Sequence, residues 1–179
     1  MAIAHPYLQT PTGETGPTGG AFDFAAGSHQ LLCQLSSDEF DDPEREAAWI
    51  REQREALLEY LAREQVNHLG VPEKPEWLLA PYIAIWSVTS KKRLGAVGWW
   101  AISGDVPTDY MSSSEIRDAR MAMRVFSRRW SKAAKQMAAG EEPDEFCIGT
   151  PDSWPELGPL LASRAKLLGE WAAADDMWS

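Results

Sequence analysis

The sequence has few of the residues that mark disulfide-rich, metal-binding and membrane proteins. Its 179 residues include only two cysteines, Cys33 and Cys147, and these have no paired spacing. We therefore expect neither a disulfide framework nor a zinc site, and we predict no bound metal and no cofactor. No apolar run approaches the roughly 20 residues of a membrane span, and no signal-peptide pattern is seen, which predicts a cytoplasmic protein without membrane contact.

Basic residues are also scarce relative to acidic ones. The chain has 27 Asp and Glu against 17 Lys and Arg, a net charge of −10. A negative surface argues against a nucleic-acid backbone or an anionic bilayer as the main partner, so we predict no nucleic-acid binding. A protein partner with a basic surface is compatible with this charge. Nine tryptophans supply large aromatic groups to a core or to a binding face.

The chain divides into a short irregular part and one longer periodic part. Residues 11–20 form a Pro, Gly and Thr stretch without helical or strand periodicity. We predict a disordered N-terminal tail over residues 1–37. The remaining length suits one ordinary core, so we expect a single α+β domain over residues 38–179.

Three segments have helical periodicity. An aspartate and a proline at Asp42-Pro43 predict a first helix to about His68, ended by Gly70. A capping box at Ser112 to Glu115 predicts that a second helix starts there and ends at Gly140. A third helix is expected from Gly158-Pro159, because Pro159 would break a backbone hydrogen bond deep inside a helix. Its predicted buried stripe is Leu160, Leu161, Leu168 and Trp171.

Two segments between the first and second helices predict strands. Residues 81–90 and 96–103 are rich in β-branched and aromatic residues and are joined by a polar turn. Trp99 and Trp100 are adjacent, so they must point to opposite faces of the sheet. Because both faces carry large apolar groups, we expect both to be covered. The predicted fold is α+β, with a central Trp-rich antiparallel β-hairpin or small sheet packed by three amphipathic helices.

The residues Gly98-Trp99-Trp100-Ala101-Ile102-Ser103-Gly104-Asp105, followed by Pro107-Thr108-Asp109-Tyr110, carry a family resemblance. Together with Asp152-Ser153-Trp154-Pro155-Glu156-Leu157, they resemble an uncharacterised bacterial family known as domain of unknown function 4826. The resemblance extends from about Phe40 to Trp178. It implies a domain boundary and no assigned activity.

The segment from Ser103 to Tyr110 is the strongest candidate for a site, because loops at strand ends often carry functional groups. It offers five polar side chains: Ser103, Asp105, Thr108, Asp109 and Tyr110. Trp100 and Arg120 complete the candidate binding set. Two carboxylates beside a hydroxyl and a phenol suit acid/base work or cation binding. The same residue types also build turns through hydrogen bonds to the backbone, and that alternative stays open.

Arginines follow this segment along the chain. Arg117 or Arg120 is placed to form a structural ion pair with Asp105 or Asp109. Arg124, Arg128 and Arg129 lie mostly off the apolar stripe of the second helix, together with Arg117, which predicts a solvated basic face.

The sequence has no nucleophile elbow, no glycine-rich phosphate loop and no His-Glu-x-x-His motif, so the best-marked enzyme classes find no support. The first hypothesis is a small acidic binding or regulatory protein, for example one that neutralises a partner. The alternative is a small hydrolase or transferase that uses the Asp105 and Asp109 loop. A third is a sensor of small molecules with a Trp-lined pocket.

Overall fold

The structure is a computed structural model that describes residues 42–93 and 95–178. The predicted tail and Cys33 lie outside these residues. The described elements, in chain order, are α2 (Pro43–Arg63), β1 (His68–Gly70), β2 (Trp77–Leu79), β3 (Ile83–Ser90), β4 (Val97–Gly104), β5 (Asp109–Ser112), α3 (Ala119–Ala138), η1 (Pro151–Ser153), α4 (Trp154–Ala173) and η2 (Asp175–Trp178).

The strands form one antiparallel sheet with the predicted hairpin at its centre. β3 pairs with β4 over its whole length, with Ile85 opposite Ile102 and Trp86 opposite Ala101. The other edge of β3 pairs with β1 at one end and with β2 at the other, and β5 pairs with β4. The prediction of an α+β fold around a Trp-rich hairpin is confirmed; the hairpin belongs to a five-stranded sheet.

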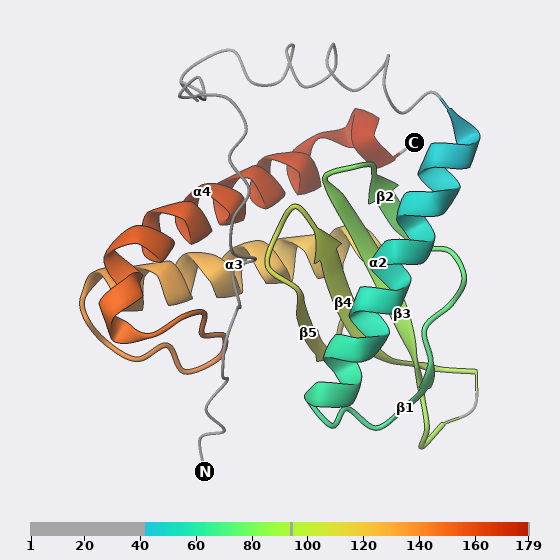
Figure 1. Cartoon of the computed structure of the whole chain (residues 1–179), viewed down its shortest axis with the longest axis horizontal. Coiled ribbons are helices and arrows are strands. Elements are labelled where there is room, and N and C mark those ends of the chain that lie inside the picture. The colour runs from blue at the N-terminus through green and yellow to red at the C-terminus, as the bar shows by residue number, and fades with distance from the viewer. Residues whose placement is uncertain (1–41, 94, 179) are drawn as a thin grey trace, which may run out of the picture.

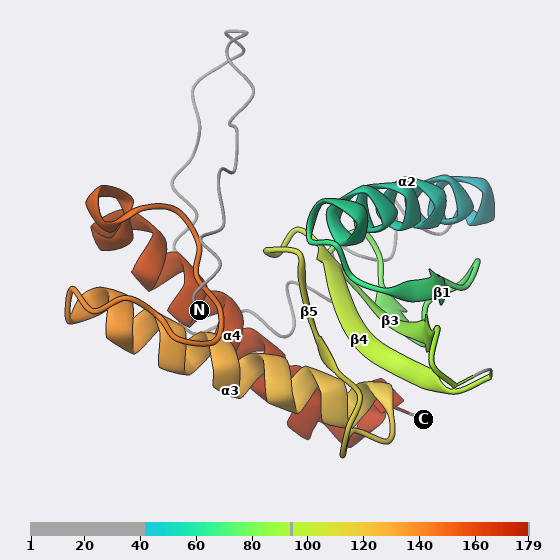
Figure 2. The same ribbon diagram turned by 90° about the horizontal axis from the view of Figure 1, so that it is seen from below.

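Helices cover both faces of this sheet (Figures 1 and 2). α2 lies across one face, and α3 and α4 lie side by side across the other. Trp86 and Trp99 face α2, whereas Ile85, Trp100 and Ile102 face α3 and α4. The two adjacent tryptophans therefore point to opposite faces, as their spacing predicts, and Trp100 is only 4% exposed.

The first helix is shorter than the sequence predicts. Asp42 caps it by accepting a hydrogen bond from the Glu44 backbone N–H at 3.0 Å, as expected. It ends at Arg63 and not near His68, because Gln65 adopts a positive φ of 55° that turns the chain away. His68 and Gly70 belong to β1, so Gly70 is not the end of a helix.

The predicted capping box at Ser112 to Glu115 is wrong. Ser112 is the last residue of β5, and the Ser113 hydroxyl donates to the backbone carbonyl of Val97 at 2.6 Å. Pairing with β4 therefore uses the residues that would have capped a helix. α3 begins at Ala119, where the Asp118 carboxylate accepts from the Met121 N–H at 2.7 Å.

The last helix begins earlier than predicted. α4 starts at Trp154, four residues before Gly158, and it contains Pro159. Because Pro159 lies only in the second turn, the helix loses a single backbone bond there, to the carbonyl of Pro155. Leu161, Leu168 and Trp171 are buried as expected, but Leu160 is 63% exposed and is not part of the buried stripe.

α3 and α4 pack antiparallel, and the Ser127 hydroxyl donates to the Ala165 carbonyl at 2.7 Å between them. After α4, the short helix η2 returns the chain to β2, where Trp178 stacks on Trp77. Within the described part of the chain, no helix has the length and apolar character needed to cross a bilayer.

Candidate functional site

The candidate segment from Ser103 to Tyr110 is not a loop that leads from a strand into a helix. Ser103 belongs to β4, and Asp109 and Tyr110 belong to β5, which pairs with β4 beside it. Only residues 105–108 form the connection, and Thr108 lies half-buried in it. The predicted strand-to-helix loop is therefore a tight connection between two strands. The sequence does not predict β5, because its four residues are too few to show the alternation of a strand.

Ser103 lies inside the sheet, and its side chain makes a structural contact. Its side chain is buried, and its hydroxyl oxygen accepts a hydrogen bond from Trp86 Nε1 at 3.1 Å. Gly104 follows with φ of 130°, and the next backbone N–H, that of Asp105, donates to the Tyr82 carbonyl at 2.8 Å. This end of β4 is therefore fixed against the start of β3.

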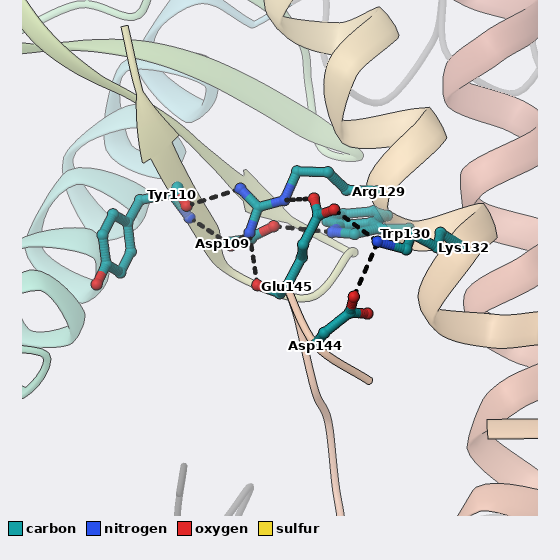
Figure 3. Close-up of polar contacts among 7 residues, drawn as sticks. All are labelled: Asp109, Tyr110, Arg129, Trp130, Lys132, Asp144 and Glu145. Carbon is teal, nitrogen blue, oxygen red and sulfur yellow. Dashed lines mark hydrogen bonds and ion pairs between the residues drawn. The ribbon is translucent and has the colours of Figure 1, made fainter. Parts of the chain in front are cut away.

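Asp109 is buried, with 3% of its surface exposed, and its carboxylate is bonded on both oxygens (Figure 3). Oδ1 accepts from the Tyr110 N–H at 2.7 Å, and Oδ2 accepts from Trp130 Nε1 at 3.0 Å. Arg129 Nη2 lies 3.8 Å from Oδ1. Arg129 also donates through Nη1 to the Tyr110 carbonyl at 3.1 Å. Asp109 thus links the edge strand β5 to the helix α3.

The network continues from Arg129 into the loop after α3 (Figure 3). Arg129 Nη2 donates to the Glu145 carbonyl at 2.8 Å. The Lys132 ammonium donates to Glu145 at 2.9 Å and to Asp144 at 3.0 Å. The hydrogen bond to Glu145 is the main reason that the pKa of Lys132 is raised, and the bond from Lys132 lowers the pKa of Asp144. These contacts fasten the loop to the helix.

Two tyrosines lie beside Asp109 on the side of α2. The rings of Tyr60 and Tyr110 meet edge to face at 6.1 Å. Burial raises the pKa of the Tyr60 phenol, and the Asp109 carboxylate adds to this effect. Burial likewise raises the pKa of Tyr110, with a further contribution from Glu64. Both phenols therefore hold their protons more tightly than free tyrosine does, which does not favour a role as a general base.

The arginine partners of the two aspartates differ from those we expected. Asp105 is exposed and pairs with Arg164 of α4 at 2.8 Å. Arg120 pairs with Asp175 at 2.6 Å and donates to the Ala172 carbonyl at 2.8 Å, so it binds neither Asp105 nor Asp109.

The predicted solvated basic face also needs a correction at two residues. Arg117 is exposed but lies before α3, which begins at Ala119, so it is not on the helix. Arg129 is only 16% exposed in its side chain, because it bonds Tyr110 and Glu145 and lies beside Asp109. The position of Arg129 in the helical repeat could have predicted that it is partly buried. Arg129 lies about 80° from the centre of the buried face of α3, whereas Arg124 and Arg128 lie on the opposite face.

A hollow of about 710 Å³ opens elsewhere, between β2, β4, the start of α3 and η2. We call it the tryptophan hollow, and it contains two of the seven candidate residues, Trp100 and Arg120. Its lining includes three tryptophans, two arginines and two acidic residues: Trp77, Trp100, Trp178, Arg117, Arg120, Glu76 and Asp118, together with Val97. Trp77 and Trp178 stack with ring centres 4.9 Å apart. Asp105 and Asp109 do not line it.

Trp77 and Trp178 are not among the site residues that the sequence predicts. They are 101 positions apart in the sequence, and no local pattern links them. In the structure, Trp77 Nε1 donates to the Met177 carbonyl at 2.9 Å and Trp178 Nε1 donates to the Trp171 carbonyl at 2.9 Å. Arg120 lies over the Trp178 ring at 5.9 Å. These contacts hold η2 in place as one wall of the hollow.

A smaller hollow of about 450 Å³ lies between α2 and the loop after β1, beside Ile50 and Arg54. Arg54 crosses it to donate to the backbone carbonyls of Val71 and Pro72. In the described residues, no three His, Cys, Asp or Glu side chains are grouped closely enough to hold a metal ion.

The negative charge is not spread evenly over the chain. Five acidic residues and no basic ones fall in residues 1–41, which leaves 22 acidic against 17 basic residues in the rest. Within that part, α3 has six basic residues and no acidic one. Net charge alone therefore does not assign a partner, and each surface has to be considered separately.

Comparison with known proteins gives one family. The chain matches the model of the family described as "Domain of unknown function (DUF4826)" over residues 43–178, and it belongs to that family. No curated protein and no solved structure matches the chain.

Proposed function

We propose that this protein is a binding protein that holds a segment of a partner protein in the tryptophan hollow. The observation that carries this proposal is the lining of the hollow of about 710 Å³, where the partly exposed rings of Trp77 and Trp178 lie beside two arginines and the nearly buried Trp100. Tryptophan and arginine are among the residues most enriched at the energetic centres of protein interfaces. The proposal includes a cytoplasmic location, as the sequence predicts.

The hollow has the chemistry of such a centre. The stacked rings of Trp77 and Trp178 and the exposed side chain of Val97 provide an apolar wall. The Arg117 side chain is exposed at the rim and has no ion pair or hydrogen bond with any of the described residues. An apolar side chain of the partner would pack on the indole rings, and an acceptor beside it would pair with Arg117.

The alternative, a hydrolase or transferase based on Asp105 and Asp109, has less support. Both oxygens of Asp109 accept hydrogen bonds inside the fold, and Asp105 pairs with Arg164 at the surface. A general base needs a free acceptor within reach of a substrate. The geometry supports a structural use of both carboxylates.

Selection of peptides tests the proposal. A display library of random 12-residue peptides is panned on the full chain, and enriched peptides are titrated against purified variants. Val97→Arg places a long charged side chain in the hollow and leaves the core intact, because Val97 is 39% exposed. Leu160→Arg is the matched control on α4, where Leu160 is exposed outside the hollow.

We expect enriched peptides to share an apolar or aromatic residue, to bind Leu160→Arg as they bind the original protein, and to bind Val97→Arg at least about tenfold more weakly. Equal binding to both variants would place the site elsewhere. A library that yields no binding peptide would also count against a peptide-binding role.

A further inference from the structure

We infer that the outward face of α3 is a docking surface for an acidic segment of a partner protein. Four basic residues define this surface, which we call the basic stripe: Arg120, Arg124, Arg128 and Lys135. At 100° per residue they fall within about 80° of arc and extend over about 22 Å of the helix. The stripe lies opposite the buried face that contains Met123, Phe126 and Trp130.

The fold uses only one end of this stripe. Arg120 and Arg124 donate to the Ala172 carbonyl at the end of α4. The side chains of Arg128 and Lys135 are exposed, and neither side chain has an ion pair or hydrogen bond with another described residue. Lys132, on the flank of the helix, differs because it pairs with Asp144 and Glu145.

The stripe is unusual for this chain. Like charges at positions i and i+4 repel, as Arg120 with Arg124 and Arg124 with Arg128, and an acidic residue among them would relieve the repulsion. α3 contains none, although the described residues have more acidic than basic side chains. Positive charge is thus concentrated along one line of an otherwise acidic molecule, which favours an anionic partner at that line.

An acidic polypeptide fits this surface better than a nucleic acid does. The stripe is one helix face wide, and at its Arg120 end the exposed carboxylate of Asp175 lies beside it, paired with Arg120. A duplex, whose major groove alone is about 12 Å across, would place phosphates beside that carboxylate. Aromatic rings lie only at the Arg120 end of the stripe, where Trp178 is, and α3 has no exposed aromatic side chain from Arg124 to Lys135 on which the bases of a single strand would stack. A peptide can follow the single line of cations without needing such rings along it.

This inference rests on the proposed function, since it presupposes a protein partner. Arg117 and Arg120 line the tryptophan hollow, and the stripe starts at Arg120. One partner segment can therefore place an apolar residue in the hollow and acidic residues along α3. The partner charge is opposite to the one that the net charge of the chain predicts.

The experiment measures binding of a fluorescein-labelled 15-residue polyglutamate peptide to the full chain at low and moderate salt. Arg128→Glu/Lys135→Glu reverses the two unpartnered cations of the stripe. Lys91→Glu/Lys92→Glu is the matched control, because it makes the same change of charge at exposed positions in the turn after β3. A DNA duplex and a DNA single strand of 20 nucleotides serve as competing probes.

We expect the peptide to bind, to bind more weakly as salt rises, and to lose at least about tenfold in affinity in the stripe variant but less than about twofold in the control. An equal loss in both double variants would show an unspecific charge effect and overturn the inference. Absence of peptide binding, or tighter binding of either DNA, would overturn it as well. If the peptides selected from the display library bind Val97→Arg as they bind the original protein, that result counts against the tryptophan hollow and not against the basic stripe. The failure of the proposed function and the failure of this inference are therefore distinguishable.

Discussion

Asp109 and Arg129 together occupy the two outward backbone groups of Tyr110, on the free edge of β5. The carboxylate of Asp109 accepts from the Tyr110 N–H at 2.7 Å, and Arg129 donates to the Tyr110 carbonyl at 3.1 Å. An edge strand with unpaired backbone groups is a template for pairing with another chain. The side chains of Asp109 and Arg129 block that pairing near the centre of the four-residue strand. The buried Asp109 therefore protects the edge of the sheet.

We predict that Asp109→Asn destabilises the fold. The amide would direct its NH₂ group at a donor, either the Tyr110 N–H or Trp130 Nε1, and would leave Arg129 without its buried counter-charge. The expected loss is about 2–4 kcal/mol in the free energy of unfolding, measured with urea. Asp105→Asn is the control, since its ion pair with Arg164 is exposed and contributes about 1 kcal/mol or less. Equal losses would contradict a structural role that is special to Asp109.

Gly104→Ala should be among the most damaging small substitutions. Gly104 has φ of 130°, and an added Cβ would collide with the Tyr82 carbonyl oxygen and lie 2.8 Å from the Ile83 Cα. The expected cost is about 3 kcal/mol or more, because both neighbours are backbone atoms. Gly140→Ala at φ of 72° has open space around it and should cost about 1 kcal/mol. Thermal unfolding of both variants checks the difference, and similar melting temperatures would refute it.

Alkaline pH should destabilise the protein partly through Tyr60. Burial raises its pKa in the folded state above the ordinary value of 10.0, so the contribution of Tyr60 to stability is fully present below pH 10 and is lost as pH rises toward the folded pKa. Tyr60→Phe removes this titration. Between pH 9 and pH 11 we expect the variant to lose about 1 kcal/mol less than the original protein. Lysines titrate equally in both proteins and cancel in the comparison. Parallel pH profiles would mean that Tyr60 does not contribute.

The central hairpin could be predicted from sequence because its signal is local. Alternation along β3 and β4 fixes which side chains share a face, and the opposite placement of Trp99 and Trp100 follows from adjacency alone. The start of α3 could not be predicted in the same way. Serine is a residue type that often caps helices, but Ser112 belongs to β5, where it pairs with Trp99 of β4. The N-cap of α3 is therefore Asp118.

The contacts of the candidate segment could not be derived from its own residues. Asp109 acquires its role from Trp130, which is 21 positions later in the sequence, and Asp105 from Arg164, which is 59 positions later. The tryptophan hollow depends on a pair of indoles even farther apart, Trp77 and Trp178. Side-chain types predict that a segment is polar, but the tertiary packing decides whether its polar groups face solvent or the fold.

A comparison of Arg120 and Arg128, two arginines on the same face of α3, separates the structural part of the basic stripe from its free part. Arg120→Met removes the donor to the Ala172 and Ala173 carbonyls and the partner of Asp175, so we expect a loss of about 1–2 kcal/mol in the free energy of unfolding. Arg128→Met removes no bond and relieves repulsion from Arg124, so the change should stay within about 0.5 kcal/mol of zero. Urea unfolding of the two variants measures both values. A loss at Arg128 as large as that at Arg120 would mean that the fold already uses its guanidinium, and the stripe would then have no free cation at its centre for a partner to bind.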